Sequence, residues 1–232
     1  MSPTQKLHRL IASIFAIGAL AGAASAQGVA AANAAPSGAG RADADAMLPE
    51  GSTPQAVVDT LQDALLTVMK RAEEMGFEGR FEYLRPVVSE TFDVTFMGSK
   101  SVGRHWSKLS AEQQADWLTQ FTGYLAANYA GNFTGYDGES FEVVGEQPAP
   151  RDTRIVLTKL KVPGGEDVIL NYRLREDEHG DWRIIDIYLK GTVSELALRR
   201  SDFSATLKEK GFAELTMAVD RKIDELRKKG GG

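Results

Sequence analysis

Residues 154–190, RIVLTKLKVPGGEDVILNYRLREDEHGDWRIIDIYLK, decide the fold class of this chain. Three runs rich in Ile, Val and Leu are separated by PGG at 163–165 and DEHG at 177–180, which are turn sequences. Connections this short join antiparallel strands, because a parallel pair needs a crossover of a dozen residues or more. Together with SFEVVG just upstream, they predict an antiparallel meander of about four strands, at residues 140–145, 154–162, 167–176 and 182–190.

The sequence before the strands has the periodicity of helices. Thr53 precedes Pro54 as an N-cap before a first-position proline, and Ser110 with Gln113 forms a capping box. A kink or break is expected at Pro86, because proline removes one helical hydrogen bond. The apolar spacing predicts helices over about 54–76, 79–92 and 110–130.

Two further helices follow the strands, separated by a stop at Gly211. Helices, then strands, then helices predict an α+β domain over residues 53–228, in which a twisted antiparallel sheet is covered by N-terminal and C-terminal helices.

The last strand is apolar on both of its faces. In a regular pleat, Ile185, Ile187 and Leu189 point one way, whereas Trp182, Ile184 and Tyr188 point the other. One face must meet the helices, and part of the remaining apolar surface is expected to line a cavity for an apolar ligand. The expected lining residues are Phe121, Tyr124, Leu125, Val143, Leu157, Leu170, Tyr172, Ile187 and Leu189.

The N-terminal residues read as an export signal. Lys6 and Arg9 precede a short apolar run, and Ala24-Ser25-Ala26 offers a cleavage site, so residues 1–26 are expected to be a secretory signal peptide. Residues 27–52, rich in Ala and Gly, are expected to form a disordered leader. Without Lys6 and Arg9 the chain has 25 basic and 32 acidic residues, a net charge of −7 that argues against nucleic-acid binding.

The usual catalytic residues are scarce. The chain has no cysteine, only His105 and His179 after the signal, and no metal or phosphate-binding motif, so no metal or cofactor is expected. Asp186 lies within an apolar strand and has two interpretations. It is either a buried general base with a raised pKa, or a hydrogen-bond acceptor for neighbours such as Tyr172 or Arg173, which we favour.

Two stretches resemble the MlaC-type family of periplasmic lipid-transfer proteins, also called toluene-tolerance auxiliary proteins. The first is FDVTFMGSKSVGRHWSKLSAEQQADWLTQFTGYLAANYAGNFTGYDGESFEV. The second is a strand, a Gly-containing turn and a helix, and the resemblance as a whole covers about residues 55–226. Its matching residues are Trp182, Arg183, Asp186, Gly191, Ser194, Arg200 and Phe203.

This resemblance implies an NTF2-like fold and a carrier that holds the acyl chains of a phospholipid in an apolar cavity. It implies a periplasmic location, with no reaction or stable membrane insertion. It also implies shuttling between an outer-membrane lipoprotein complex and an inner-membrane MCE-domain/ABC transporter complex. The HpnM-type proteins associated with hopanoid lipids are similar in the C-terminal region, so the resemblance allows a phospholipid or a hopanoid-type lipid.

Two other functions stay open on the residues. One is an NTF2-like isomerase or dehydratase that uses Asp186, with Tyr172 as its partner. The other is an envelope adaptor that binds no ligand. Basic residues of the helix after Ser194 either meet lipid head groups or partner surfaces, or form a solvated helix face, which we favour. They are Arg199, Arg200, Lys208 and Lys210.

Overall fold

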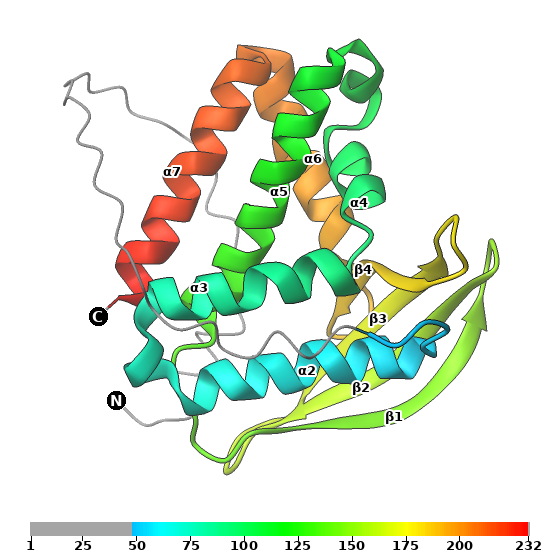
Figure 1. Cartoon of the computed structure of the whole chain (residues 1–232), viewed down its shortest axis with the longest axis vertical. Helices are drawn as coiled ribbons and strands as arrows, with labels where there is room; N and C mark the ends of the chain where they lie inside the picture. Colours follow the sequence, from blue (N-terminus) through cyan, green and yellow to red (C-terminus); the bar gives the residue numbers. More distant parts are fainter. Residues whose placement is uncertain (1–47, 232) are drawn as a thin grey trace.

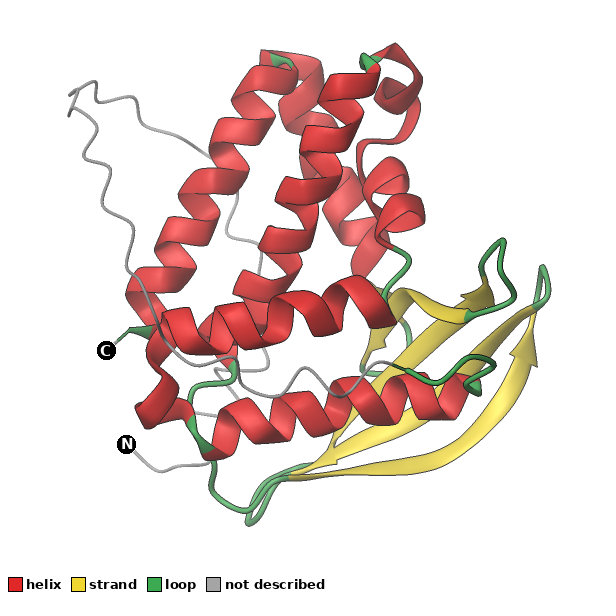
Figure 2. Ribbon diagram, in the orientation of Figure 1, coloured by secondary structure: helices red, strands yellow, loops and turns green. Residues whose placement is uncertain are grey.

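A computed structural model describes residues 48–231 of the chain (Figures 1 and 2). The expected signal peptide and most of the expected leader lie outside the described residues. The elements are α2 (Pro54–Lys70), α3 (Ala72–Thr91), α4 (Val94–Val102), the 3₁₀ helix η1 (Gly103–Lys108), α5 (Ala111–Asn132), β1 (Ser140–Ala149), β2 (Thr153–Lys161), β3 (Val168–Glu176), β4 (Trp182–Leu189), β5 (Val193–Ser194), α6 (Glu195–Lys210) and α7 (Phe212–Gly230).

The strands form one antiparallel sheet in the order β1-β2-β3-β4-β5, which confirms the predicted α+β class and the meander. The sheet has five strands rather than the four predicted. The additional strand is short: Val193 and Ser194, which follow the turn at Gly191, pair with the end of β4. Among residues 48–231, no helix combines the length and the apolar character needed to cross a bilayer.

The helices before the sheet begin where the capping signals predict. The Thr53 side chain accepts a hydrogen bond from the Ala56 N–H, and Ser110 and Gln113 form a complete capping box at the start of α5. The predicted break at Gly76 is present, since Gly76 is non-helical at φ 58° within α3. A further break, after Lys70 at the end of α2, was not predicted.

Pro86 does not interrupt α3, so the predicted kink or break there is wrong. Proline leaves the carbonyl four residues earlier, that of Glu82, without its helical donor. Glu82 and Pro86 are both exposed, so water can hydrogen-bond to that carbonyl at little cost.

A bulge in β4 changes which side chains share a face. Arg173 pairs with Asp186, but the next residue of β3, Leu174, pairs with Ile184, so Ile185 is an extra residue. Ile184 therefore lies on the same face of the sheet as Ile187, next to the buried side chains of Leu174 and Tyr172 on β3. The regular alternation expected from the sequence, with Ile184 and Ile187 on opposite faces, is wrong for this reason.

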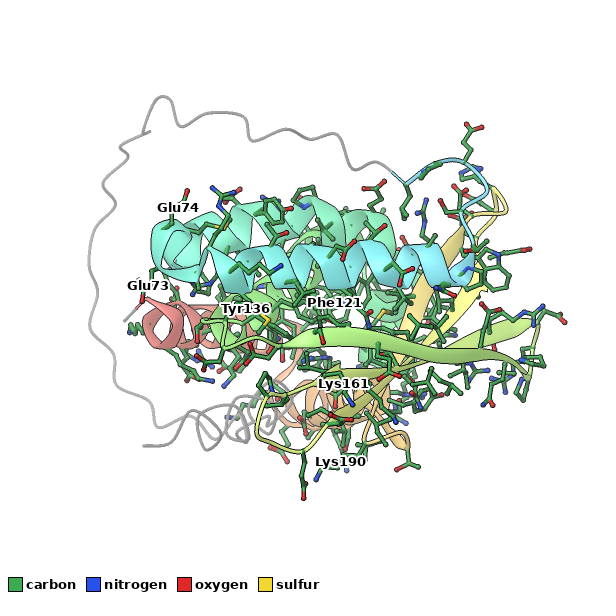
Figure 3. The ribbon with its side chains drawn as sticks, turned by 90° about the horizontal axis from the view of Figure 1, so that it is seen from below. Glu73, Glu74, Phe121, Tyr136, Lys161 and Lys190 are labelled. Carbon is green, nitrogen blue, oxygen red and sulfur yellow. The ribbon has the colours of Figure 1, made fainter. Side chains whose placement is uncertain are left out.

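The helices pack on each other and on one face of the sheet. In Figure 1, α2 lies along the sheet, α3 lies beside α2, and α5 and α7 stand side by side across them. Figure 3 shows Phe121 of α5 in the interior and Lys161 and Lys190 toward the outside of the sheet. Trp117 of α5 is fully buried, makes edge contacts with Phe203 of α6 and Phe212 of α7, and donates a hydrogen bond to the Gly98 carbonyl of α4.

Arg80 connects three helices at the other end of the bundle. Its side chain is 2 % exposed and donates hydrogen bonds of 2.7–3.0 Å to the backbone carbonyls of Ala72, Ala130 and Gly230. Ala130 and Gly230 lie in the last turns of α5 and α7, where carbonyl groups lack helical partners. A buried cation therefore satisfies helix ends that would otherwise be unpaired.

Candidate functional site

A small cavity lies between the helices and the sheet. Its volume is about 20 Å³, enough for one water molecule. Residues from the end of α3, from α4, α5 and α6, and from β4 surround it. They are Phe92, Met97, Leu125, Asn128, Tyr129, Ile187, Glu195 and Arg199.

One side of this cavity is apolar. Met97 comes from α4, Leu125 from α5, Ile187 from β4, and Phe92 from the segment that follows α3. Phe92 is held there because its neighbour Asp93 donates a backbone hydrogen bond of 2.9 Å to the Ile184 carbonyl of β4. Two helices, the segment after α3 and a strand thus form the apolar side of the cavity.

Of the residues expected to line a cavity, Leu125 and Ile187 do so. Five others are buried or half-buried on the helix-facing side of the sheet or on α5, in the hydrophobic core beside the cavity: Phe121, Tyr124, Leu170, Tyr172 and Leu189. Val143 of β1 is half-buried, pairs with the buried Thr158 and also packs on the core. Whether these residues contact a ligand stays a prediction.

The prediction that Leu157 faces the helices and lines the cavity is wrong. It pairs with Asn171, on the sheet face opposite Val156 and Leu160, which are fully buried. Leu157 itself is half-buried, and Ile169 on the same face is 41 % exposed. The β2 run is apolar at consecutive positions, so its sequence does not indicate which alternate residues face the helices.

The other side of the cavity is polar, and sequence reasoning missed it. Arg199 was expected on a solvated helix face, but it is 4 % exposed. Its guanidinium donates a hydrogen bond to the Tyr124 hydroxyl and lies 4.8 Å from the centre of that ring. The spacing of Arg199 with Phe203 on the apolar stripe of α6 was the signal that identifies it as buried.

Glu195 lies one helical turn before Arg199 and is 3 % exposed. The closest approach between the two side chains is 4.0 Å, from Arg199 Nη2 to Glu195 Oε2. Among the described residues, neither carboxylate oxygen of Glu195 has a hydrogen-bond donor. Burial is the main cause that raises the pKa of Glu195 to about 7; Asp186 adds to the rise, and Arg199 opposes it.

Asp186, by contrast, has donors for both of its oxygens. One oxygen accepts hydrogen bonds from the backbone N–H groups of Ile187 and Leu196, at 2.9 and 3.1 Å, and the other accepts from the Ser194 hydroxyl at 2.6 Å. Burial raises the pKa of Asp186 against the lowering effect of these bonds. The carboxylate therefore ties β4 to the first turn of α6, as an acceptor for donors other than those expected.

The pairing of Asp186 with Tyr172 as acid and base is not supported by the geometry. Tyr172 pairs with Ile187 in the sheet, so its side chain and that of Asp186 lie on opposite faces. Tyr172 is buried in the core, where desolvation raises its pKa to about 12. Asp186 is not a lining residue of the cavity.

The histidines offer no alternative site. His179 lies in the exposed β3–β4 turn, and His105 lies in the short helix η1. No group of three or more metal-ligating side chains occurs within residues 48–231.

A wider hollow of about 650 Å³ lies where residues 48–52 meet the end of α3 and the start of β4. Its lining includes Glu90, Asp181 and Arg183 beside Leu48 and Trp182. Arg183 donates to the Glu90 carbonyl and forms an ion pair with Asp181. Charged groups line this hollow, so its walls are less suited to an acyl chain than the apolar side of the small cavity.

Two comparisons with known proteins agree with this architecture. The family model described as MlaC protein matches residues 59–220, about 70 % of the chain. A solved structure of a phospholipid-binding protein from Ralstonia solanacearum, in complex with a phospholipid, is similar with a TM-score of 0.65 and 22 % sequence identity. The similarity covers 75 % of this chain and 99 % of that one, and it shows a shared fold.

Proposed function

The chain belongs to the MlaC family, and on this basis we propose that it is a lipid carrier that holds the acyl chains of a phospholipid in the cavity between α4, α5, α6 and β4. The observation that carries the proposal is the position of this cavity, enclosed between the helices and the sheet and apolar on the side of Phe92, Met97, Leu125 and Ile187. That the structurally similar Ralstonia protein binds a phospholipid supports the ligand class.

The hydrophobic effect gives such a cavity a purpose. Burial of each CH₂ group is favourable by about 0.8 kcal/mol, so moving a chain of some sixteen carbons into water costs on the order of 10 kcal/mol of free energy. A carrier that offers an apolar interior lowers this barrier to crossing an aqueous space. The proposed chemistry is binding alone, without a catalytic step.

The cavity must widen before a lipid can enter, because it has room for one water molecule. We assign this movement to α6. Its connections to the neighbouring elements run through Gly191 and Gly211, which have φ angles of 78° and 85° and can change conformation more readily than other residues. Displacing α6 removes Glu195 and Arg199 from the cavity wall and opens the apolar side.

The wider setting follows from the family and from the export signal expected at residues 1–26. The proposed location is the periplasm, and the proposed partners are an outer-membrane lipoprotein complex and an inner-membrane MCE-domain/ABC transporter complex. A hopanoid-type lipid in place of a phospholipid is the second ligand class, suggested by the similarity to HpnM-type proteins.

Native mass spectrometry of the mature protein tests the carrier function. Protein purified from a bacterial periplasm, or incubated with liposomes, is expected to carry lipid, and liposomes with and without a hopanoid distinguish the two ligand classes. Ile187→Phe adds volume to the cavity wall and should lower lipid capture severalfold. Val144→Phe, at a β1 position that is 52 % exposed, is the matched control and should capture lipid as the unchanged protein does.

A protein that is lipid-free when purified and that takes up no lipid from liposomes would contradict the carrier function. Equal capture by the Ile187→Phe and Val144→Phe variants would show that lipid binds elsewhere on the molecule.

A further inference from the structure

The segment formed by α4 and η1 carries positive charge and no negative charge. Residues 94–111 include Lys100, Arg104 and Lys108 but no aspartate or glutamate, although acidic residues outnumber basic ones in the whole chain, 32 to 27. All three cations are exposed. Arg200 of α6 is exposed as well and lies beside them, since a Cβ atom added at Gly103, where α4 meets η1, would be 3.2 Å from Arg200 Nε. We call Lys100, Arg104, Lys108 and Arg200 the basic patch.

The four cations of the basic patch are free to meet an outside partner. Within residues 48–231, none of their side chains forms an ion pair or a hydrogen bond with another protein group. The exposed arginines of α7 differ, since Arg221 and Arg227 each form an ion pair with a glutamate. Cations that are gathered on one surface without neutralising partners attract anionic groups.

Two aromatic side chains lie among these cations. Phe96 of α4 and Trp106 of η1 are half-buried, and both pack on the edge of the hydrophobic core. The Lys100 ammonium lies 5.4 Å from the centre of the Phe96 ring, so the cation and the ring share one surface. Trp and Phe beside Lys and Arg are typical of surfaces that rest between lipid head groups and acyl chains. An acidic protein surface matches the cations alone, so this composition favours a lipid surface.

The basic patch lies on the outer side of the cavity wall that α4 and α6 form. Met97 of α4 lines the cavity, and Lys100, three residues on, is exposed. Arg199 of α6 lines the cavity, and its neighbour Arg200 is exposed. The two helices pack against each other (Figure 1), so the patch has cations on both sides of the seam that opens when α6 moves as proposed.

We propose that the basic patch is a docking surface for an anionic lipid membrane, which places the seam between α4 and α6 against the bilayer. This inference rests on the proposed carrier function for its purpose, because a docked carrier opens toward the membrane that supplies or receives the lipid. At physiological ionic strength the Debye length is about 8 Å, so the patch responds to nearby lipid phosphates while acidic residues elsewhere are largely screened. Each Lys or Arg near an anionic membrane strengthens binding about fivefold.

Vesicle sedimentation tests the docking surface on the unchanged protein. Mature protein is mixed, at about 0.1 M salt, with vesicles of phosphatidylcholine alone or of equal parts phosphatidylcholine and phosphatidylglycerol, and the bound fraction is measured after centrifugation. Four cations at about fivefold each allow a preference of several hundredfold, and repulsion from acidic residues lowers it, so anionic vesicles should bind at least about fiftyfold more tightly. Raising the salt to about 0.5 M should remove most of this preference, because the Debye length becomes shorter.

Substitution then locates the surface. The triple variant Lys100→Gln, Arg104→Gln, Arg200→Gln removes one cation each from α4, η1 and α6 and leaves Lys108. Its preference for anionic vesicles should therefore fall to about fivefold or less, the contribution of one cation. All three positions are exposed, and circular dichroism checks that the variant folds.

A matched control removes the same charge from elsewhere on the molecule. Lys70→Gln, Arg85→Gln, Lys228→Gln changes exposed positions of α2, α3 and α7. It makes the net charge of the protein as negative as that of the first triple variant. Its preference for anionic vesicles should change by less than about threefold, because distant charges are screened.

The outcomes separate this inference from the proposed function. Equal binding to both kinds of vesicle by the unchanged protein overturns the docking surface, and the carrier function stands if the protein still captures lipid. An equal loss in the two triple variants overturns its location. Ile187→Phe, which should lower lipid capture, is expected to leave vesicle binding unchanged. A parallel loss of both would show that sedimentation reports the cavity and would overturn the docking surface.

Discussion

Glu195→Gln should stabilise the lipid-free protein at neutral pH and leave its stability almost unchanged in mild acid. The pKa of Glu195 is raised from 4.5 to about 7 by burial. Between these two values the folded protein holds a proton that the unfolded chain releases, so the free energy of unfolding falls as pH rises through this window. Below about pH 4.5 both states are protonated, and above about pH 7 the loss is complete.

The size of the effect follows from the shift. At about 1.4 kcal/mol per pKa unit, the wild-type protein loses roughly 3 kcal/mol of stability between pH 4.5 and pH 7 that the variant keeps. For a chain of this length, that corresponds to a gap in Tm of about 6 to 12 °C. The pKa of Asp186 is also raised, but Asp186 is present in both proteins, so its contribution cancels to first order in the comparison.

The measurement is urea unfolding followed by circular dichroism, on delipidated wild-type and variant protein from pH 5.0 to pH 8.5. Glu209→Gln, at an exposed position of α6, should follow the wild-type curve within about 0.5 kcal/mol. A difference between wild type and Glu195→Gln that is the same at pH 5.0 and pH 8.5 would refute the reasoning. It would mean that the carboxylate is solvated in the folded protein.

Three other substitutions test separate parts of the structure. Arg80→Met leaves three buried backbone carbonyls without this donor, so the free energy of unfolding in urea should fall by about 3 kcal/mol or more. Arg85→Met, at an exposed position of the same helix, is the control and should lower it by less than about 0.5 kcal/mol. Leu170→Ala should cost about 2–4 kcal/mol and Leu157→Ala clearly less, and equal losses would contradict the strand register. Asp186→Asn replaces one accepting oxygen with an NH₂ donor, which leaves a donor at the start of α6 without its acceptor, so it should lower stability by about 1–2 kcal/mol while lipid capture persists; loss of capture in a folded variant would show that Asp186 acts in the cavity.

The parts of the fold that sequence predicts well are those with local signals. The capping box at Ser110 and the short turns between strands depend on residues a few positions apart, and they are confirmed. The bulge at Ile185 is different. Ile184, Ile185 and Ile187 are equally apolar, so moving the extra residue leaves the hydrophobic pattern unchanged, and the face of each residue is decided by pairing with β3.

The site was predicted on its apolar side and missed on its polar side for a related reason. Leu125 and Ile187 follow from the expectation that apolar side chains cover the sheet. Glu195 and Arg199, four residues apart on a helix, have the spacing of an ordinary exposed ion pair. The spacing of Arg199 with Phe203 indicates the burial of Arg199, but its partner Tyr124 of α5 lies 75 positions away in the sequence, and no local pattern indicates that Glu195 is buried as well.

Asp186 and Ile187 are consecutive residues, and they serve two elements at once. Ile187 belongs to the cavity wall, while Asp186 accepts the hydrogen bond of the Leu196 N–H in the first turn of α6. The rate at which that amide proton exchanges with solvent deuterium therefore reports how often α6 moves away from the sheet. Slow exchange would mean that α6 rarely leaves the sheet, and slower exchange in the presence of lipid would mean that bound lipid makes this movement rarer. NMR can follow the exchange in the unmodified protein.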